Sequence, residues 1–245
     1  MTIELTAQTA VGQERGHNED SVLADTPADH TALLAVADGM GGHAAGDVAS
    51  QLAIDTLRAE FLSDDRAFPP RDAWEDRLST AMTEANETIR THGDGNRDRS
   101  GMGTTLVAAL IEGDTAVVGN VGDSRAYTVT GEEIEQVTVD HSLVQQLVDQ
   151  GQISQADAAD HPQRNVISQS LGTDETVDPD FFEVTAAETL LLCSDGLTEE
   201  VTDETISEIV STADSVDAAA DQLVDRANEN GGSDNISVVL VEFPE

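Results

Sequence analysis

The stretch Leu33-Leu34-Ala35-Val36-Ala37-Asp38-Gly39-Met40-Gly41-Gly42 decides how the rest of the chain is interpreted. Its apolar run at 33–37 is typical of a buried strand, and the run ends on the carboxylate of Asp38. The glycines that follow allow a tight turn and a close approach of the backbone to whatever this carboxylate binds. The apolar run at 190–193 leads in the same way to Asp195-Gly196. Two core strands that each deliver an Asp-Gly to one place predict a cluster of divalent metal ions.

Charge is the most unusual property of the sequence. The 245 residues include 49 Asp and Glu against 11 Lys and Arg, the formal net charge is −38, and every one of these basic residues is Arg. Such a surface repels nucleic acid and anionic membranes, so neither is expected as a partner. Self-repulsion weakens when salt shortens the Debye length to about 3 Å at 1 M, which indicates a halophilic protein from a salt-rich cytoplasm. The acidic residues are spread along the whole chain, which argues against an acidic tail.

The single cysteine and the N-terminus bear on location. Cys193 lies inside an apolar run, so no internal disulfide is expected and a reducing compartment is favoured. The N-terminus lacks the basic and apolar regions of a signal peptide, and no apolar run approaches the length of a membrane span. We therefore expect a cytoplasmic protein, and nothing in 1–245 marks a domain boundary.

Periodicity divides the chain into strands and helices. Alternating or continuous apolar runs predict strands at 2–11, 21–24, 31–38, 104–111, 116–120, 126–129, 134–137, 181–184, 189–194 and 236–241. Helical spacing predicts helices at 45–57, 74–89, 143–148, 203–211 and 215–230. Asp140 or Ser142 can cap the helix at 143–148, and Gly151 ends it. Residues 152–180 show little periodicity and are expected to form an irregular flap.

The order of these elements predicts the fold class. Strands fall into two blocks and long helices into two pairs, with few strand–helix alternations. The turns Gly113-Asp114 and Gly131-Glu132 indicate hairpins within the first block. This order favours an α+β protein in which two antiparallel sheets pack face to face, with a pair of helices on each outer side.

Five acidic residues are candidate metal ligands because each adjoins a strand end or a glycine: Glu19, Asp38, Asp123, Asp195 and Asp234. Hard divalent cations prefer carboxylate, carbonyl and water oxygens, which implicates Mg²⁺ or Mn²⁺. No Cys and His set has the spacing of a zinc site. In a chain this acidic, a single Asp at a strand end carries little information, so the specificity lies in the neighbouring residues.

Those neighbours form seven blocks in a fixed order along the chain: Arg15-Gly-His-Asn18-Glu19-Asp20-Ser, Ala37-Asp38-Gly39-Met40-Gly41-Gly42, Met102-Gly103-Thr104-Thr105, Gly122-Asp123-Ser124-Arg125-Ala126-Tyr127, Asp140-His141-Ser142, Ser194-Asp195-Gly196 and Ser233-Asp234-Asn235-Ile236. Together they resemble the metal-dependent protein serine/threonine phosphatases of type 2C, in their compact bacterial form. The resemblance covers roughly residues 3–242 and implies an α-β-β-α sandwich.

The resemblance also implies roles for individual residues. Asp38 is expected to bridge two metal ions, with Asp195 and Asp234 completing the first metal site. Glu19 and the carbonyl group of Gly39 serve the second site, and Asp123 with Asp195 would hold a third ion. Arg15 corresponds to the residue that grips the phosphate, while Asp20 and Asn235 correspond to residues that orient the ligands and the metal-bound waters.

The expected reaction is hydrolysis of phosphoserine or phosphothreonine in cytoplasmic proteins. Two divalent ions would share a water and lower its pKa, and the resulting hydroxide would attack phosphorus in line, without a phospho-enzyme intermediate. The metals and Arg15 would offset charge on the phosphoryl oxygens. The expected partners are phosphoproteins modified by a Ser/Thr kinase, which places the protein in signal transduction, and the expected state is a monomer.

The sequence departs from the family pattern at two positions. Some eukaryotic relatives carry a proposed leaving-group acid, a His, where Met40 stands, so His43, His17 or a metal-bound water are the candidates for this acid. Each of these histidines is otherwise interpreted as a surface side chain, and His141 as part of a helix cap or of packing. The second departure is Gln169, where relatives often carry a basic residue.

Two other functions were weighed against general protein dephosphorylation. A non-catalytic binding module on the same fold would be expected to have lost some ligands, and none is missing here. A regulatory phosphatase acting on a phosphorylated anti-sigma antagonist would keep the chemistry and change the partner, although no sensor domain is attached. Substrate profiling would distinguish the latter from the general phosphatase.

Overall fold

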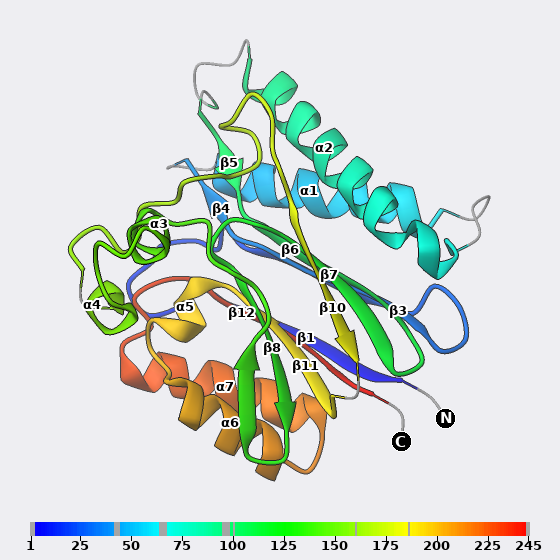
Figure 1. Cartoon of the computed structure of the whole chain (residues 1–245), viewed down its shortest axis with the longest axis vertical. Coiled ribbons are helices and arrows are strands. Elements are labelled where there is room, and N and C mark those ends of the chain that lie inside the picture. Colours follow the sequence, from blue (N-terminus) through cyan, green and yellow to red (C-terminus); the bar gives the residue numbers. More distant parts are fainter. Residues whose placement is uncertain are drawn as a thin grey trace.

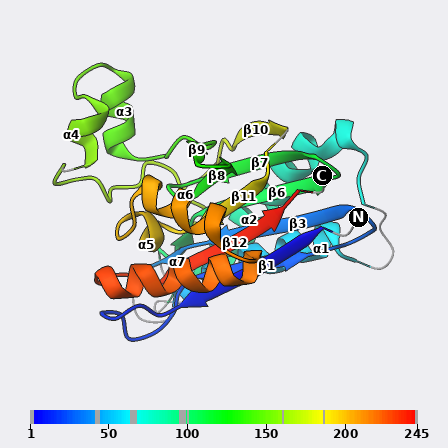
Figure 2. The ribbon, with the colours of Figure 1, turned by 90° about the horizontal axis from the view of Figure 1, so that it is seen from below.

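Two antiparallel sheets form the centre of the protein, and helices cover the outer face of each (Figure 1). The computed structural model describes residues 3–41, 45–63, 68–94, 99, 101–159, 161–185 and 187–243. The layers are followed in Figure 1, where α1 and α2 lie above the strands and α6 and α7 below them, and in Figure 2, seen from below, α6 and α7 lie in front of the strands. The predicted α-β-β-α sandwich is therefore confirmed.

The first sheet contains strands from both ends of the chain. Its order is β1 (Glu4–Ala10), β12 (Ile236–Glu242), β11 (Thr189–Cys193), β8 (Arg125–Thr130) and β9 (Glu133–Gln136), with every neighbouring pair antiparallel. The register joins Leu5 to Val241 and Leu190 to the same Val241. The C-terminal strand β12 is thus an interior strand that joins β1 to the rest of the sheet.

The second sheet is assembled from the middle of the chain. Its order is β10 (Asp180–Thr185), β7 (Thr115–Val121), β6 (Leu106–Glu112), β3 (Thr31–Ala37) and β2 (Ser21–Asp25), again antiparallel throughout. The two predicted hairpins are present, with Gly113 (φ 63°) between β6 and β7 and Gly131 (φ 56°) between β8 and β9. Glycine suits these turns because, without a Cβ atom, it adopts a positive φ at no steric cost.

Strand β3 shows why the opening apolar run is continuous. Leu33, Ala35 and Ala37 belong to the cluster beneath α1 and α2, whereas alternate residues Leu34 and Val36 belong to the cluster between the sheets. Because successive side chains on a strand point to opposite faces, a strand buried on both faces must be apolar at every position. All seven residues of β3 are buried.

The long helices occur in the two predicted pairs. Helices α1 (Gly46–Phe61) and α2 (Trp74–Gly93) cover the second sheet, and α6 (Asp203–Thr212) and α7 (Val216–Asn230) cover the first. Thr202 and Ser215 cap α6 and α7 by accepting from the backbone N–H three residues ahead. No helix in the described ranges is long and apolar enough to cross a membrane.

The structure differs from the predicted elements mainly in short helices and strands. The flap carries a helical turn, α4 (Gln155–Ala159), a short helix α5 (Asp195–Thr198) begins at Asp195 itself, and a 3₁₀ turn η1 (Arg71–Ala73) precedes α2. The expected strand at 104–111 is broken into β5 (Gly103–Thr104) and β6, because β5 pairs instead with β4 (Gly39–Met40). Ser142 rather than Asp140 caps α3 (Leu143–Asp149), since Asp140 binds Arg125.

Candidate functional site

The predicted site residues lie at junctions where strands end or begin. Asp38 lies between β3 and β4, Asp123 between β7 and β8, and Asp195 at the start of α5 after β11. Asp234 comes two residues before β12, and Glu19 two residues before β2. Segments from both sheets therefore bring these carboxyl groups toward the same end of the sandwich.

The pKa of Asp38 shows how closely its neighbours approach. Burial is the first cause that raises this pKa well above its usual range, and the negative charges of four other carboxylates raise it further: Asp20, Asp195, Asp123 and Asp234. Charges of one sign influence each other this strongly only at short range in a poorly solvated site. The structure therefore brings the predicted carboxylates together around Asp38.

The other members of the cluster respond in the same direction. Burial, with the charges of Asp195 and Asp140, raises the pKa of Asp123 to about 8. Burial, with the charges of Glu199 and Asp234, raises the pKa of Asp195 to about 6, although a hydrogen bond with Asp38 works the other way. Carboxyl groups in this condition require protons or a positive charge among them to remain buried.

The donor chemistry of the cluster fits a hard divalent cation. Oδ1 of Asp195 and Oδ1 of Asp20 are buried without a hydrogen-bond partner among the described residues. Carboxylate oxygens are the ligands that Mg²⁺ and Mn²⁺ prefer. No three His, Cys, Asp or Glu side chains in the described ranges already enclose a cation position, however. Two of the predicted ligands, Asp234 and Glu19, are bound by neighbouring side chains of the protein.

Those side chains are Arg15 and His17. Nη2 of Arg15 donates to Oδ2 of Asp234 at 2.5 Å, and Nε2 of His17 lies 2.7 Å from Oε1 of Glu19. The Arg15 side chain is 54% exposed, so its remaining N–H groups are accessible to a ligand. Arg15, predicted to grip phosphate, thus lies at the solvent side of the cluster.

Asn235 connects the two ends of the chain at the site. Its Oδ1 accepts from the backbone N–H of Glu19 at 2.8 Å, and its Nδ2 donates to the carbonyl groups of Val11 and His17. The amide therefore holds the 11–19 loop next to Asp234. Its predicted role as an orienting residue stays a prediction, but these contacts give it a physical basis.

Asp20 is fixed by two serines that sequence reasoning did not single out. The hydroxyl groups of Ser194 and Ser237 donate to its Oδ2 at 2.9 and 2.6 Å. Burial nevertheless raises the pKa of Asp20 to about 7, because the two hydrogen bonds only partly offset the loss of water and the charges of Asp195 and Asp234. Ser194 directly precedes Asp195 in the block Ser194-Asp195-Gly196, and this position is the sequence feature that could have identified it.

A second pair of hydroxyl groups holds the backbone of Asp38. Thr105 Oγ1 accepts from the Asp38 N–H at 2.9 Å, while the Thr105 N–H and the Thr104 hydroxyl both donate to the Asp38 carbonyl. Thr105 Oγ1 also lies 2.7 Å from the hydroxyl of Ser124, the residue after Asp123. The block Met102–Thr105 therefore links the loop of Asp38 to the loop of Asp123.

Glycines are required where backbones meet at the site. A Cβ atom on Gly39 would overlap the carbonyl oxygens of Gly46 and Glu19, and one on Gly196 would overlap the carbonyl of Asn235. Only glycine lets these chains approach so closely. The two Asp-Gly pairs thus bring separate segments against each other, as well as forming turns.

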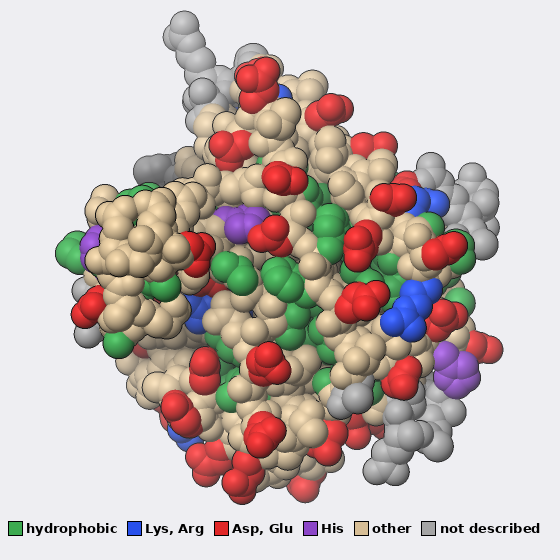
Figure 3. Space-filling view, viewed as in Figure 1, with side chains coloured by type: hydrophobic (Ala, Val, Ile, Leu, Met, Phe, Trp, Pro, Cys, Tyr) green, Lys and Arg blue, Asp and Glu red, His purple; other side chains and the backbone are tan. Residues whose placement is uncertain are grey.

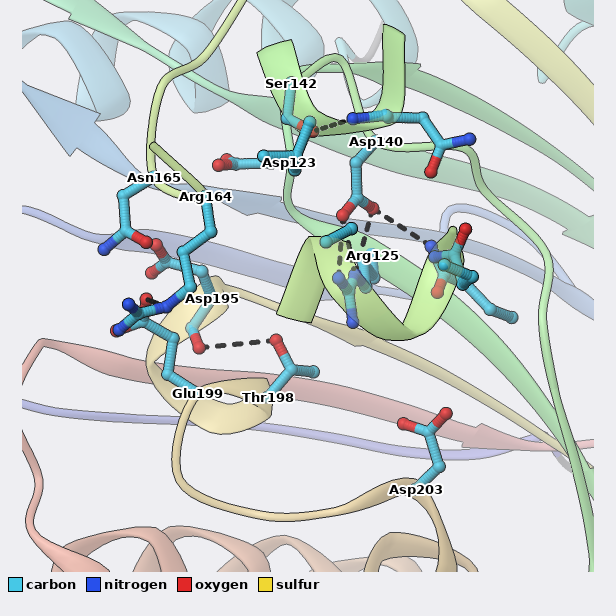
Figure 4. Close-up of a pocket in the computed structure, with 15 residues that line it drawn as sticks. Asp123, Arg125, Asp140, Ser142, Arg164, Asn165, Asp195, Thr198, Glu199 and Asp203 are labelled. Carbon is cyan, nitrogen blue, oxygen red and sulfur yellow. Dashed lines mark hydrogen bonds and ion pairs between the residues drawn. The ribbon is translucent and has the colours of Figure 1, made fainter. Parts of the chain in front are cut away.

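A pocket opens beside the cluster. It has a volume of about 460 Å³ and lies between α5 and the flap, with Asp123 and Asp195 on its wall (Figure 4). Arg125 forms a bidentate ion pair with Asp140 there and also donates to the hydroxyl of Tyr127. The pocket is large enough for part of a polypeptide.

Comparison with known proteins identifies the chain. The family model for "Protein phosphatase 2C" matches residues 9–240. The chain belongs to the protein phosphatase 2C family. Serine/threonine phosphatase stp of Listeria monocytogenes is 40% identical over 237 residues, which cover 96% of this chain and 94% of that protein. PstP of Mycobacterium tuberculosis is 41% identical over 244 residues, which cover 99% of this chain and 45% of PstP.

Solved structures of phosphatases agree with this membership. Stp1 from Staphylococcus aureus superimposes with a TM-score of 0.94 at 37% identity, covering 100% of this chain and 96% of Stp1. The catalytic domain of PstP in complex with two manganese ions gives a TM-score of 0.84 at 38% identity, covering 98% and 97%. This chain is a serine/threonine phosphatase of the protein phosphatase 2C type.

The remaining predicted residues are the histidines considered above and Gln169. His43 lies outside the described residues, and His17 is paired with Glu19. Gln169 bonds to His141 and to the backbone of Asp178, which accounts for a neutral amide in the flap at this position. His141 is partly buried and takes no part in the cap of α3, which Ser142 provides.

Proposed function

We propose that the phosphatase reaction takes place at the carboxylate cluster, and that the cluster holds the divalent ions. Asp38 would be the ligand shared by two ions, Asp195 and Asp234 would complete the first position, and Glu19 with the Gly39 carbonyl would form the second. The observations that support this assignment are the convergence of carboxyl groups from separate segments of the chain, the buried Oδ1 atoms of Asp20 and Asp195 that have no hydrogen-bond partner among the described residues, and the raised pKa of Asp38, Asp123 and Asp195. Such a group is costly to bury unless cations neutralise it.

A third position involves Asp123 with Asp195. Each of these two carboxyl groups lines the pocket, and the charge of Asp195 raises the pKa of Asp123. Their mutual repulsion supports a cation between them. The proposed occupancy is two ions in the core site and a third beside the pocket.

The chemistry divides between the ions and the protein. Divalent ions bound here supply Lewis acidity to the phosphoryl oxygens and make a water nucleophile available near neutral pH. Arg15 binds the phosphoryl oxygens through its planar set of N–H donors, and its 54% exposed side chain is accessible to a substrate from solvent. Because water accepts the phosphoryl group, no phospho-enzyme forms. His43 is the proposed donor of the proton to the leaving Ser or Thr oxygen.

The acidic surface of the enzyme indicates the environment in which we propose that it works. Acidic side chains are scattered over the whole visible face of the molecule (Figure 3), in keeping with the net charge of −38. We propose a monomeric, single-domain halophilic enzyme of a salt-rich cytoplasm, in which screening reduces self-repulsion. Its substrates are proteins phosphorylated by a Ser/Thr kinase in signal transduction, and the pocket beside Asp123 receives residues that flank the phosphorylated side chain.

The test is phosphate release from a phosphothreonine peptide with Mn²⁺ in molar KCl. Asp38→Asn should lower the rate by at least a factor of about 100, because loss of a stabilising charge at the reacting centre costs several kcal/mol. Asp55→Asn, which changes an exposed carboxylate on α1, is the matched control and should keep the wild-type rate. Equal rates for Asp38→Asn and the wild-type protein would refute the assignment of Asp38.

A further inference from the structure

His141 meets three parts of the molecule through one ring. Its Nδ1 lies 3.2 Å from the backbone nitrogen of Gly122 and 2.9 Å from Nε2 of Gln169. Its Nε2 lies 3.0 Å from Oδ2 of Asp180, at the start of β10. The side chain is 13% exposed, so these contacts replace most of its hydration. None of these contacts belongs to the cap of α3.

The partners determine which nitrogen carries the proton. A backbone N–H can only donate, so Nδ1 must accept from Gly122. The Gln169 amide is oriented by its Oε1, which accepts from the Asp178 N–H at 2.7 Å, and its NH₂ group therefore faces Nδ1. Nε2 then carries the hydrogen and donates to Asp180. One neutral tautomer is compatible with every partner, and the Gly122 and Gln169 donors share the single lone pair of Nδ1.

Gly122 is held at both of its backbone polar groups by the same residue. The His141 N–H donates to the Gly122 carbonyl at 2.9 Å, while the His141 ring accepts from the Gly122 N–H. Gly122 has φ of +114°, and a Cβ atom there would lie 2.6 Å from the Thr105 side chain. Glycine has wide conformational freedom, so these bonds restrict the backbone immediately before Asp123.

The flap is attached to the same residue. The Ser168 N–H donates to the His141 carbonyl at 2.8 Å, and the Gln169 side chain adds its bond to Nδ1. Gln169 also donates to the Asp178 carbonyl at 3.0 Å, so it ties the two ends of the 169–178 segment together beside the ring. The loop of Asp123 and the flap thus share one acceptor nitrogen.

We propose that His141 is a positioning residue whose Nδ1 fixes the Gly122–Asp123 loop and the flap relative to each other. This inference deepens the proposed function, since it gives Asp123 its place as a ligand. Residues that orient a metal ligand typically change metal affinity 10- to 100-fold when they are altered. His141 touches none of the reacting groups and acts through Gly122.

Two substitutions separate the nitrogens of the ring. His141→Asn places an amide oxygen where Nδ1 stands and keeps an acceptor for Gly122, whereas His141→Gln extends its amide toward Asp180 and abandons Gly122. Of the two hydrogen bonds to Nδ1, Gln169→Leu removes only the one from the flap, and Asp180→Asn retains both. The four single variants are compared in the full-length protein.

The first measurement is amide hydrogen exchange in the metal-free protein, read residue by residue. His141→Gln should raise exchange at Gly122 about tenfold or more and should loosen 168–169, while His141→Asn and Asp180→Asn keep Gly122 within about threefold of the wild-type rate. Gln169→Leu should loosen the flap and leave Gly122 protected. Equal protection of Gly122 in the Asn and Gln variants would overturn the proposal.

The second measurement is Mn²⁺ binding by titration calorimetry. His141→Gln should weaken binding of the ion assigned to Asp123 and Asp195 by a factor of about 10 to 100, and His141→Asn should bind this ion about as tightly as the wild-type protein. Unchanged binding in His141→Gln would overturn the link to Asp123. Failure of the proposed function is distinguishable from failure of this inference. The exchange pattern at Gly122 is measured in the metal-free protein, so it does not depend on whether the wild-type protein has phosphatase activity.

Discussion

Thr105 offers the sharpest test of how the fold supports the site. Its side chain is fully buried, and its hydroxyl oxygen accepts from the Asp38 N–H at 2.9 Å and lies 2.7 Å from the Ser124 hydroxyl. Thr105→Val keeps the shape of the side chain and removes the hydroxyl. Two buried polar groups then lose a partner in a region that water does not reach.

The cost follows from these contacts. A buried donor or acceptor without a partner costs about 1–3 kcal/mol, so losing the partner of two groups should lower the free energy of unfolding by about 2–6 kcal/mol. Thr105→Ser keeps the hydroxyl and loses only one methyl group, for about 1 kcal/mol. The difference between the two variants isolates the hydrogen bonds.

Urea unfolding of the metal-free protein in molar KCl measures both variants. With a slope of about 3 kcal/mol/M, the midpoint of Thr105→Val should fall by about 0.7–2 M and that of Thr105→Ser by about 0.3 M. Added Mn²⁺ should stabilise Thr105→Val less than Thr105→Ser, because Asp38 is less firmly placed. Midpoints that agree within about 0.1 M would show that the hydroxyl does not support Asp38.

Three further outcomes are expected. The metal-free protein should lose stability as pH rises from 5 to 8, because the unfolded chain releases its carboxyl protons near pH 3.8, whereas folded Asp195, Asp20 and Asp123 have pKa values of about 6, 7 and 8. Asp20→Asn should reduce this pH dependence of the thermal unfolding midpoint. A stability that rises between pH 5 and 8 would contradict the reasoning. The thermal midpoint should increase between 0.1 and 2 M KCl as screening weakens repulsion, and a constant midpoint would leave the halophilic assignment without support. Cys193 should resist iodoacetamide at pH 9 until urea unfolds the protein, because burial raises the pKa of its thiol to about 12, and rapid labelling of the folded chain would contradict this.

Local sequence patterns predicted the elements more successfully than their junctions. Continuous apolar runs, such as the one in β3, correspond to strands buried on both faces, and helical spacing identified all four long helices. The split of 104–111 at Thr105 could not be predicted, because it arises from hydrogen bonds to Asp38, which lies 67 residues away. The same holds for α5, which begins at Asp195 directly after the strand expected at 189–194, where no helix was predicted.

The candidate site was predicted as residues and not as contacts. Glycines and strand ends indicated where acidic side chains matter, since turn geometry and strand burial depend on a few neighbouring residues. The supports of that site were not visible in the same way. Ser194, Thr105 and His141 stand in the motif blocks, but no local pattern in those blocks indicates that they bind Asp20, Asp38 and Gly122.

The sequence by itself therefore determined the layers of this phosphatase, its acidic surface and the identities of its predicted ligands, because these depend on short-range pattern and composition. Only the tertiary structure decided which groups meet. Glu19 and Asn235 are 216 residues apart in the chain, yet the amide of one binds the backbone of the other. Their contact depends on β12 lying inside the sheet between β1 and β11, and strand pairing over such separations is set by the packing of the whole core.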